Sequence, residues 1–317
     1  MLDDLERRIT AALQVDGRAP WRKIAAVLGE PERTVARRGA DLLASGAVNV
    51  IGLQVRTDAA LLRLECLPGT ARVAAESMAQ RKDSTFSYLM TGGADCVAEV
   101  TVETGQLNSI LASEIPATMG VTRVLSYPVA QYFRSIRGWR AGMLTEAQEA
   151  ALSSEYTADH PALGGARQEP LAVQDARIVQ VLVGDGRATI ESIARQAGVS
   201  ETTASRRTDW LLRNNRVQIR TVVEPAEVGL PVEALLWMRI APDRVERVGR
   251  ELAKLRPVRY AAALIGDYQI VADVTMPDSQ ALYRFITESP WAREVEAIHS
   301  TMLLQARKRG GWLLPLR

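Results

Sequence analysis

The stretch DGRAPWRKIAAVLGEPERTVARR, residues 16–38, returns as DGRATIESIARQAGVSETTASRR at residues 185–207. The two copies align without a gap at a spacing of 169 residues, from Ile9 and Ile178 through to Val48 and Val217. Apolar, glycine and paired arginine positions are shared, whereas many of the polar positions between them differ. We therefore interpret the chain as an internal duplication whose halves keep one fold but differ at the positions that could contact a partner.

Each copy has the pattern of three short helices. In the first, apolar residues recur at helical spacing before Asp16, over residues 21–28 and over 32–45, and Gly29 breaks the pattern between the last two. A helix, a turn containing glycine and a second helix are typical of a helix-turn-helix unit. Ser200 is expected to cap the last helix of the second copy, whereas Pro31 supplies no capping hydroxyl in the first. Residues 47–55 and 216–223 alternate apolar and polar, which predicts a short wing hairpin or a single lead-in strand.

The last helix of such a unit enters the major groove of DNA. Once the inward positions are removed, the predicted contacts are Glu32, Arg33, Ala36, Arg37 and Arg38 in the first copy, and Ser200, Glu201, Thr202, Ser205, Arg206 and Arg207 in the second. Arginine suits guanine, and Arg38 and Arg207 are expected to clamp phosphate. The alternative is a solvated arginine face without DNA. Residues 1–50 hold eight basic and seven acidic residues and residues 171–222 hold eight and five, so we expect the second copy to bind phosphate more strongly.

A second kind of module follows each helical one. A shift of 174 residues aligns Gly92 with Gly266 and Val97 with Val271. The predicted order is strand, helix, strand, strand, helix, strand over 60–129 and again over 232–305, which is ferredoxin-like. Asp243 with Glu246 predicts a capping box, and Asp278 is expected to cap the last helix. Helices cover one face of such a sheet, so we expect the second copy to cover the other.

These patterns predict an α+β chain, a tandem repeat of a winged helix-turn-helix followed by a ferredoxin-like domain. The expected boundaries are 1–55 and 171–224 for the helix-turn-helix domains, 58–135 and 230–310 for the ferredoxin-like domains, and 138–170 for a linker. Within this linker, Thr145 and Gln148 have the spacing of a capping box at the start of a short helix. Residues 155–170 are rich in proline, glycine and polar residues, which predicts a flexible connector.

The segment SETTASRR at residues 200–207, the bridge VVEPAEVGLPVEA at 222–234 and the Gly-x-x-Asp at Gly92 together resemble the leucine-responsive regulator (Lrp/AsnC) family, here duplicated over nearly the whole chain. The resemblance implies a transcription regulator whose ferredoxin-like modules dimerise and bind an amino acid or other small effector. It places the effector at Gly92, Gly93 and Asp95 in the first copy, and at Gly266, Asp267 and Gln269 in the second. The second copy has a glutamine in place of the acid, which weakens the case for amine recognition there. Both segments also have the composition of ordinary tight β-turns.

Enzyme readings have less support in the sequence. There are two histidines, His160 and His299, and no nucleophile-elbow, HExxH or phosphate-loop pattern. A sirohaem-decarboxylase-like enzyme on the same fold is one alternative, although the hairpins over 87–96 and 260–269 carry no histidine. The other is a ligand-sensing or partner-binding module whose helix-turn-helix units are degenerate. We expect a regulator that is not an enzyme and has no cofactor or metal.

The remaining expectations concern partners and location. The net charge is +2, so binding to double-stranded DNA would depend on local arginine clusters. Cys66 and Cys96 are expected to be free thiols. No signal peptide or membrane helix is predicted, which favours a cytoplasmic protein, and we expect a homo-dimer or higher homo-oligomer. Because the halves have diverged, our hypothesis is a covalent pseudo-dimer that recognises an asymmetric site with half-sites about one helical turn, or a multiple, apart.

Overall fold

A computed structural model describes residues 1–154 and 169–315, and these divide into two compact units. One unit holds both helical modules, and the other holds both ferredoxin-like modules. Most of the expected connector, residues 155–168 with His160 among them, lies outside the described residues. Within the described residues no helix combines the length and the apolar character that a membrane crossing requires.

Each helical module contains three helices followed by one strand. The elements are α1 (Asp4–Val15), α2 (Trp21–Leu28), α3 (Glu32–Ala44) and β1 (Val48–Gln54) in the first copy, and α7 (Val173–Gly184), α8 (Ile190–Ala197), α9 (Glu201–Arg213) and β6 (Val217–Val223) in the second. Ser200 Oγ accepts from Thr203 N–H at 3.2 Å, which confirms the predicted cap, and Pro31 makes no side-chain cap bond. The core residues match at the 169-residue spacing: Ile9, Leu13, Ile24, Val35 and Leu42 are fully or almost fully buried, as are Ile178, Leu182, Ile193, Ala204 and Leu211.

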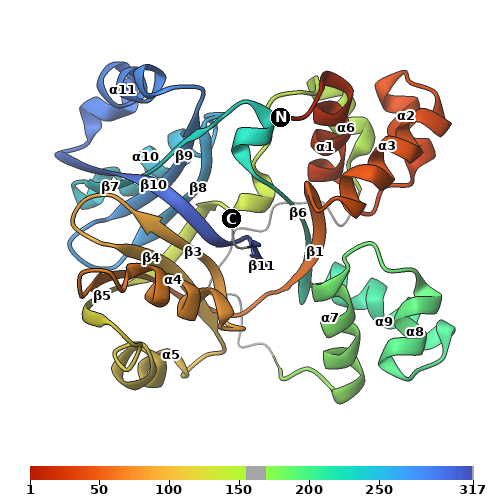
Figure 1. Cartoon of the computed structure of the whole chain (residues 1–317), viewed down its shortest axis with the longest axis horizontal. Helices are drawn as coiled ribbons and strands as arrows, with labels where there is room; N and C mark the ends of the chain where they lie inside the picture. Colours follow the sequence, from red (N-terminus) through yellow and green to blue (C-terminus); the bar gives the residue numbers. More distant parts are fainter. Residues whose placement is uncertain (155–168, 316–317) are drawn as a thin grey trace. The chain divides into compact units, whose positions relative to one another are not determined.

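The strand of each helical module pairs with the strand of the other copy, so the single lead-in strand is correct and the wing hairpin is not. β1 and β6 are antiparallel, and Ile51 lies opposite Arg220, its own equivalent at the 169-residue spacing. Such a register requires a local pseudo-two-fold axis between the copies. In Figure 1 the helices of the first copy (red) lie above this strand pair and those of the second (green) lie below it.

The expected linker contains a helix that belongs to the first unit. Helix α6 (Glu146–Leu152) begins with the predicted capping box, in which Thr145 Oγ1 accepts from Gln148 N–H. Leu152 is fully buried, and Lys23 Nζ donates to its carbonyl at 2.7 Å. The segment Arg140–Ser154 is therefore packed against the first helical module rather than extended between domains.

The second unit contains both ferredoxin-like copies. The first is formed by β2 (Asp58–Cys66), α4 (Ala71–Gln80), β3 (Ser84–Met90), β4 (Cys96–Val102), α5 (Leu107–Ser109) continued by a π-helical turn, and β5 (Val121–Arg134). The second is formed by β7 (Val232–Arg239), α10 (Val245–Leu252), β8 (Val258–Leu264), β9 (Ile270–Met276), α11 (Ser279–Glu288) and β10 (Ala297–Arg309), followed by the short β11 (Trp312–Leu313). Asp278 Oδ1 caps α11 as predicted, at 2.7 Å from Ala281 N–H. The capping box predicted at Asp243 is wrong, because Asp243 lies in a 3₁₀ turn and Arg244 takes the N-cap position without a side-chain bond.

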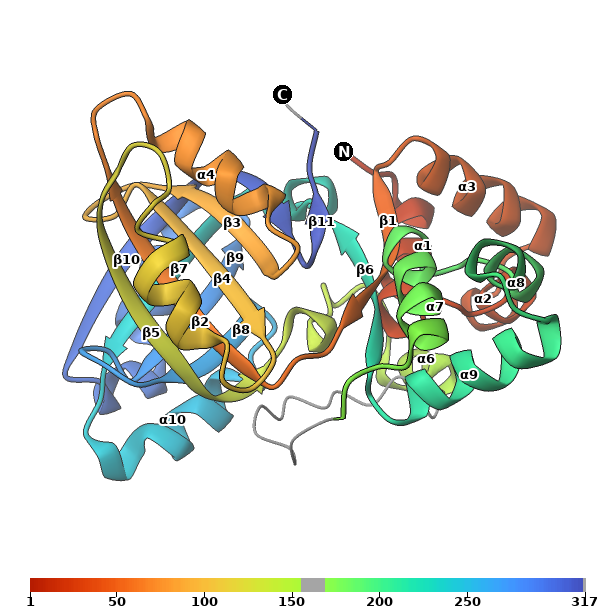
Figure 2. The same ribbon diagram turned by 90° about the horizontal axis from the view of Figure 1, so that it is seen from below.

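The two ferredoxin-like sheets join into one closed barrel. Strand β5 pairs with β2 and with β8 of the other copy, while β10 pairs with β7 and with β3. One apolar cluster inside the barrel includes Leu61, Tyr88, Trp237 and Tyr260, so both copies contribute to it. The helices cover the outer faces, and Figure 2 shows α4 against β3 and β4 with α10 on another side of the barrel. Each copy therefore covers the inner face of the other, as expected.

Candidate DNA interface and effector turns

The outward face of the last helix in each helical module carries the predicted DNA contacts. In α3, Glu32, Arg33 and Arg37 are exposed, and Ala36 is half-buried. In α9 and its cap, the exposed positions are Ser200, Glu201, Thr202, Ser205 and Arg206. The inward residues Val35 and Ala204 are fully buried, which fixes the rotation of both helices. The predicted contact face is therefore open to solvent in both copies.

The two outward faces differ in charge. Arg37 Nη1 lies 3.2 Å from Asp41 Oδ2, one helical turn away on the same exposed face. The equivalent of Asp41 is Trp210, and within the described residues Arg206 has no acidic partner at ion-pair distance. A phosphate approaching Arg206 would not compete with a carboxylate, whereas one approaching Arg37 would. This contrast agrees with the stronger phosphate binding expected of the second copy.

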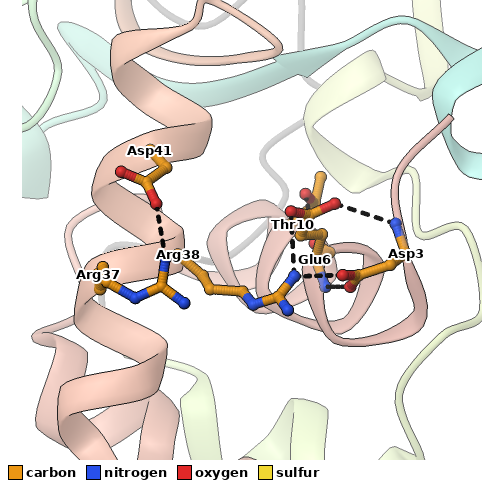
Figure 3. Close-up of polar contacts among 6 residues, drawn as sticks. All are labelled: Asp3, Glu6, Thr10, Arg37, Arg38 and Asp41. Carbon is orange, nitrogen blue, oxygen red and sulfur yellow. Dashed lines mark hydrogen bonds and ion pairs between the residues drawn. The ribbon is translucent and has the colours of Figure 1, made fainter.

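Arg38 and Arg207 have internal partners, so the structure does not support the expected phosphate clamp. Arg38 Nη1 bonds Asp3 and lies 3.2 Å from Glu6 Oε1 on α1 (Figure 3). The bond from Glu6 N–H, together with Arg38, holds the pKa of Asp3 below its usual value. In the second copy Arg207 Nε donates to Asp175 Oδ1 at 2.7 Å on α7, and its Nη2 bonds the other carboxylate oxygen.

Both arginines thus tie the last helix to the first. Arg207 is held more firmly, because the side chain of its partner Asp175 is only 3% exposed. The Arg207 guanidinium also lies 4.4 Å from the Trp210 ring. The Asp3 carboxylate is half exposed, which weakens its attraction for Arg38. The repeated Arg-Arg pair therefore combines one outward arginine, at Arg37 or Arg206, with one that stabilises the module.

A pair of half-buried arginines joins the two helical modules. Arg18 Nη1 and Nη2 donate to the carbonyls of Gly186 and Ala188 at 2.5 and 3.1 Å. Arg187 returns the same bonds to the carbonyls of Gly17 and Ala19, at the same distances. We call Arg18 and Arg187 the arginine clasp. Partial burial lowers the pKa of both guanidinium groups from its usual value.

The clasp gives Gly-Arg the same role in both copies, and the sequence analysis did not identify this role because it took Asp16 only as the end of a helical pattern. A Cβ on Gly17 would lie 2.9 Å from side-chain atoms of Ile219, and one on Gly186 would lie 2.9 Å from the Ile51 backbone. Each glycine therefore allows close approach of the other copy's strand. The signal was in the sequence, because glycine and arginine recur together at the same place in both halves.

The predicted effector turns lie between β3 and β4 and between β8 and β9. Asp95 Oδ2 accepts from Cys66 N–H at 2.8 Å, and Gln269 Oε1 accepts from Ile240 N–H at 3.0 Å. These two bonds are equivalent at the 174-residue spacing. Because acid and amide serve alike as acceptors, the change from Asp95 to Gln269 preserves this bond. One oxygen of the Asp95 carboxylate is therefore bonded to the end of β2, and the Gln269 amide makes the equivalent bond to the residue that follows β7.

The turn glycines meet the opposite copy. Gly92 has φ of +89° and a Cβ there would lie 3.3 Å from Thr301 Cγ2, while Gly266 has φ of +148° and a Cβ would lie 2.8 Å from Tyr127 Cδ1. Gly93 lies against Arg63, whose Nη2 would be 3.7 Å from a Cβ at that position. Asp267, next to Gly266, is exposed. The turns are thus part of the contact between the copies.

No group of three or more histidine, cysteine, aspartate or glutamate side chains suited to a metal occurs in the part of the chain that the structure describes. Both cysteines are free, and burial raises the pKa of the Cys96 thiol to about 12. Two buried carboxylates have several partners each. Glu233 accepts from Arg309 and Arg259, and Glu99 accepts from the hydroxyls of Thr85, Tyr132 and Tyr260.

Comparison with known proteins identifies both kinds of module. The AsnC-type helix-turn-helix domain matches residues 2–43 and 173–212, and the Lrp/AsnC ligand binding domain matches residues 233–313. An uncharacterised HTH-type transcriptional regulator of Pyrococcus abyssi is 30% identical over 141 residues, which is 44% of this chain and 88% of that protein. The HTH-type transcriptional regulator Ptr1 of Methanocaldococcus jannaschii is 26% identical over 138 residues, covering 43% of this chain and 93% of the relative. Each relative thus aligns nearly whole with less than half of this chain.

Among solved structures, the siroheme decarboxylase NirDL has a TM-score of 0.61 and covers 97% of this chain and 93% of its own. The sequence identity is 14%, so this likeness concerns the fold. It extends over both halves of this chain.

Proposed function

This chain belongs to the Lrp/AsnC family of helix-turn-helix transcription regulators, and we propose that its two halves act on DNA as one covalent pseudo-dimer. The observation that carries the proposal is the pairing of Ile51 with Arg220, its own equivalent, in the β1–β6 register. Two separate chains in a two-fold dimer would make this contact between copies of one residue. Here a single chain supplies both partners.

The DNA site of such a pseudo-dimer is asymmetric. The two outward faces offer Arg33, Ala36 and Arg37 in one half-site, and Thr202, Ser205 and Arg206 at the same positions in the other. Bidentate arginine contacts favour guanine, whereas hydroxyl side chains accept several bases. We therefore propose a first half-site richer in guanine contacts and a second held more by phosphate.

In this proposal the ferredoxin-like unit takes the effector role, and the chain acts as a regulator rather than as an enzyme. Its domain match is to a ligand-binding module, and its relatives are named as transcription regulators. The fold likeness to a siroheme decarboxylase covers the whole chain, so an enzyme remains the second candidate. Turnover of a tetrapyrrole by the purified chain would favour that candidate over the regulator.

The proposal is tested by fluorescence anisotropy of the purified chain on the DNA upstream of its own gene, with a scrambled fragment as control and a salt series. We expect nanomolar binding to the upstream DNA that weakens steeply with salt. Equal, weak binding to both fragments would contradict the proposal.

The same assay separates the two helical modules. Arg206→Ala should weaken binding more than Arg37→Ala, by about fivefold to tenfold, because Arg37 is already paired with Asp41. Both side chains are exposed, so neither change should alter folding. Equal losses would remove the ranking while leaving DNA binding in place.

A further inference from the structure

Arg63 is a buried cation without a counter-ion. It lies on β2 and is only 7% exposed, yet within the described residues no aspartate or glutamate reaches it at ion-pair distance. Its side chain hydrogen-bonds with that of Tyr127, and its guanidinium carbon lies 5.2 Å from the ring of Trp237 and 5.7 Å from that of Tyr268. Aromatic faces attract a cation but compensate only part of its lost hydration. A charge in this setting is expected to have an anionic partner.

Both copies build the surroundings of Arg63. Trp237 is the equivalent of Arg63 at the 174-residue spacing, and the two side chains meet inside the barrel. Gly93, in the first effector turn, lies against the Arg63 guanidinium, and Tyr268 belongs to the second turn. Tyr127, which packs on Gly266, lies 5.5 Å from the Trp237 ring. The cation therefore adjoins both turns, although it comes from one copy alone.

Polar atoms without partners gather around this cation. Nε of Arg63, Nε1 of Trp237 and Nε2 of His299 are buried and make no hydrogen bond. The His299 ring lies 6.5 Å from that of Tyr268. Burial, together with the charge on Arg63, lowers the pKa of His299, which favours its neutral form. Two of these three nitrogens can only donate, so the group that completes them must bring acceptors.

We propose that Arg63, Trp237, Tyr268 and His299 form the binding site of a small organic carboxylate, with one site in each chain. This carboxylate site names the ligand class of the effector role proposed above, and its regulatory meaning depends on that proposal. The guanidinium takes the carboxylate through charge-assisted bonds, and the rings contact the rest of the ligand. Tyr268 and His299 are only half-buried, so a ligand can approach from solvent on their side. In this proposal recognition rests on the acid end of the ligand, which the Arg63 guanidinium takes.

The site is tested with acetate, lactate and benzoate as probes, each against its neutral amide, by titration calorimetry and thermal shift on the full chain. Wild-type protein should bind at least one acid about tenfold more tightly than its amide, and Arg63→Met should lose this preference. Arg56→Met is the matched control, because Arg56 is a half-buried arginine of the same unit that bonds Thr101 Oγ1 at 3.4 Å. It should bind as wild type does.

Arg63→Met should also raise the melting temperature of the unliganded protein, because it removes a buried charge that no carboxylate pairs. Failure of all three acids to bind wild-type protein, or equal binding by Arg63→Met, would overturn the carboxylate site. DNA affinity without ligand should be the same in wild type and Arg63→Met. A wild-type chain that binds a carboxylate but no specific DNA would refute the proposed regulator while leaving the carboxylate site standing.

Discussion

Replacement of one arginine of the clasp should lower the free energy that holds strands β1 and β6 of the two helical modules together. Arg18→Met keeps the length of the side chain but removes two bonds to the carbonyls of Gly186 and Ala188. A hydrogen bond to a charged group contributes about 1.5–3 kcal/mol, and the variant also avoids the cost of burying the cation. We expect a net loss of about 2–3 kcal/mol in the free energy of opening the β1–β6 pair.

Arg187→Met should cost more than Arg18→Met. The bonds that it removes have the same lengths, but Arg187 also lies 4.4 Å from the ring of Trp21. The residue equivalent to Trp21 in the other copy is Ile190, which offers no aromatic face to Arg18. A cation–π contact contributes about 0.5–1 kcal/mol, and this is the expected difference between the two variants.

The assay is native-state hydrogen exchange of the full chain, followed in peptides that cover Val48–Gln54 and Val217–Val223. Both variants should speed exchange in both strands, because each clasp arginine bonds the opposite copy. Arg22→Met is the control, since Arg22 is exposed on the same module. A smaller effect of Arg187→Met than of Arg18→Met, or acceleration by Arg22→Met, would refute the reasoning.

Two further predictions concern buried charges. Burial raises the pKa of Asp273 from 3.8 to about 6, so this group stabilises the fold while it is protonated, and about 3 kcal/mol is lost between about pH 4 and 7. Asp273→Asn should flatten that decline in a series of melting temperatures against pH; an unchanged slope would show that the carboxyl does not cause it. Arg207→Leu strands the buried Asp175 carboxylate and should lower the free energy of unfolding of its unit by about 3–5 kcal/mol, against about 1 for Arg38→Leu. Urea denaturation measures the free energy of unfolding of both variants. Similar losses would contradict the argument that the more buried carboxylate depends more on its arginine.

Elements whose determinants are local could be predicted from the sequence. The three helices of each module follow from apolar spacing and from glycine breaks such as Gly29, where φ is +69°. The cap at Ser200 and the capping box at Thr145 depend on side chains three residues from their partners. The cap predicted at Asp243 was wrong for a reason that is also local: Pro242 starts a 3₁₀ turn, so the α-helix begins two residues after Asp243, at Val245.

Features that depend on contact between the copies could not be predicted. Nothing in residues 47–55 distinguishes a wing hairpin from a strand that pairs 169 positions away, since both alternate apolar and polar residues. Arg38 has the sequence position of a phosphate contact, and only the placement of α1 assigns it to Asp3 and Glu6. Arg63 lies in a strand pattern that gives no hint of Trp237, because the two residues meet only when the barrel closes.

The central claim is that one chain reads two different half-sites. It is tested most directly by selecting bound sequences from a random DNA pool with the full-length protein and aligning the two halves of the recovered site. We predict a non-palindromic site whose half-sites are separated by about one helical turn or a multiple, and whose first half changes when Arg33 is replaced by threonine. A perfect palindrome that is unaffected by Arg33→Thr would contradict the claim.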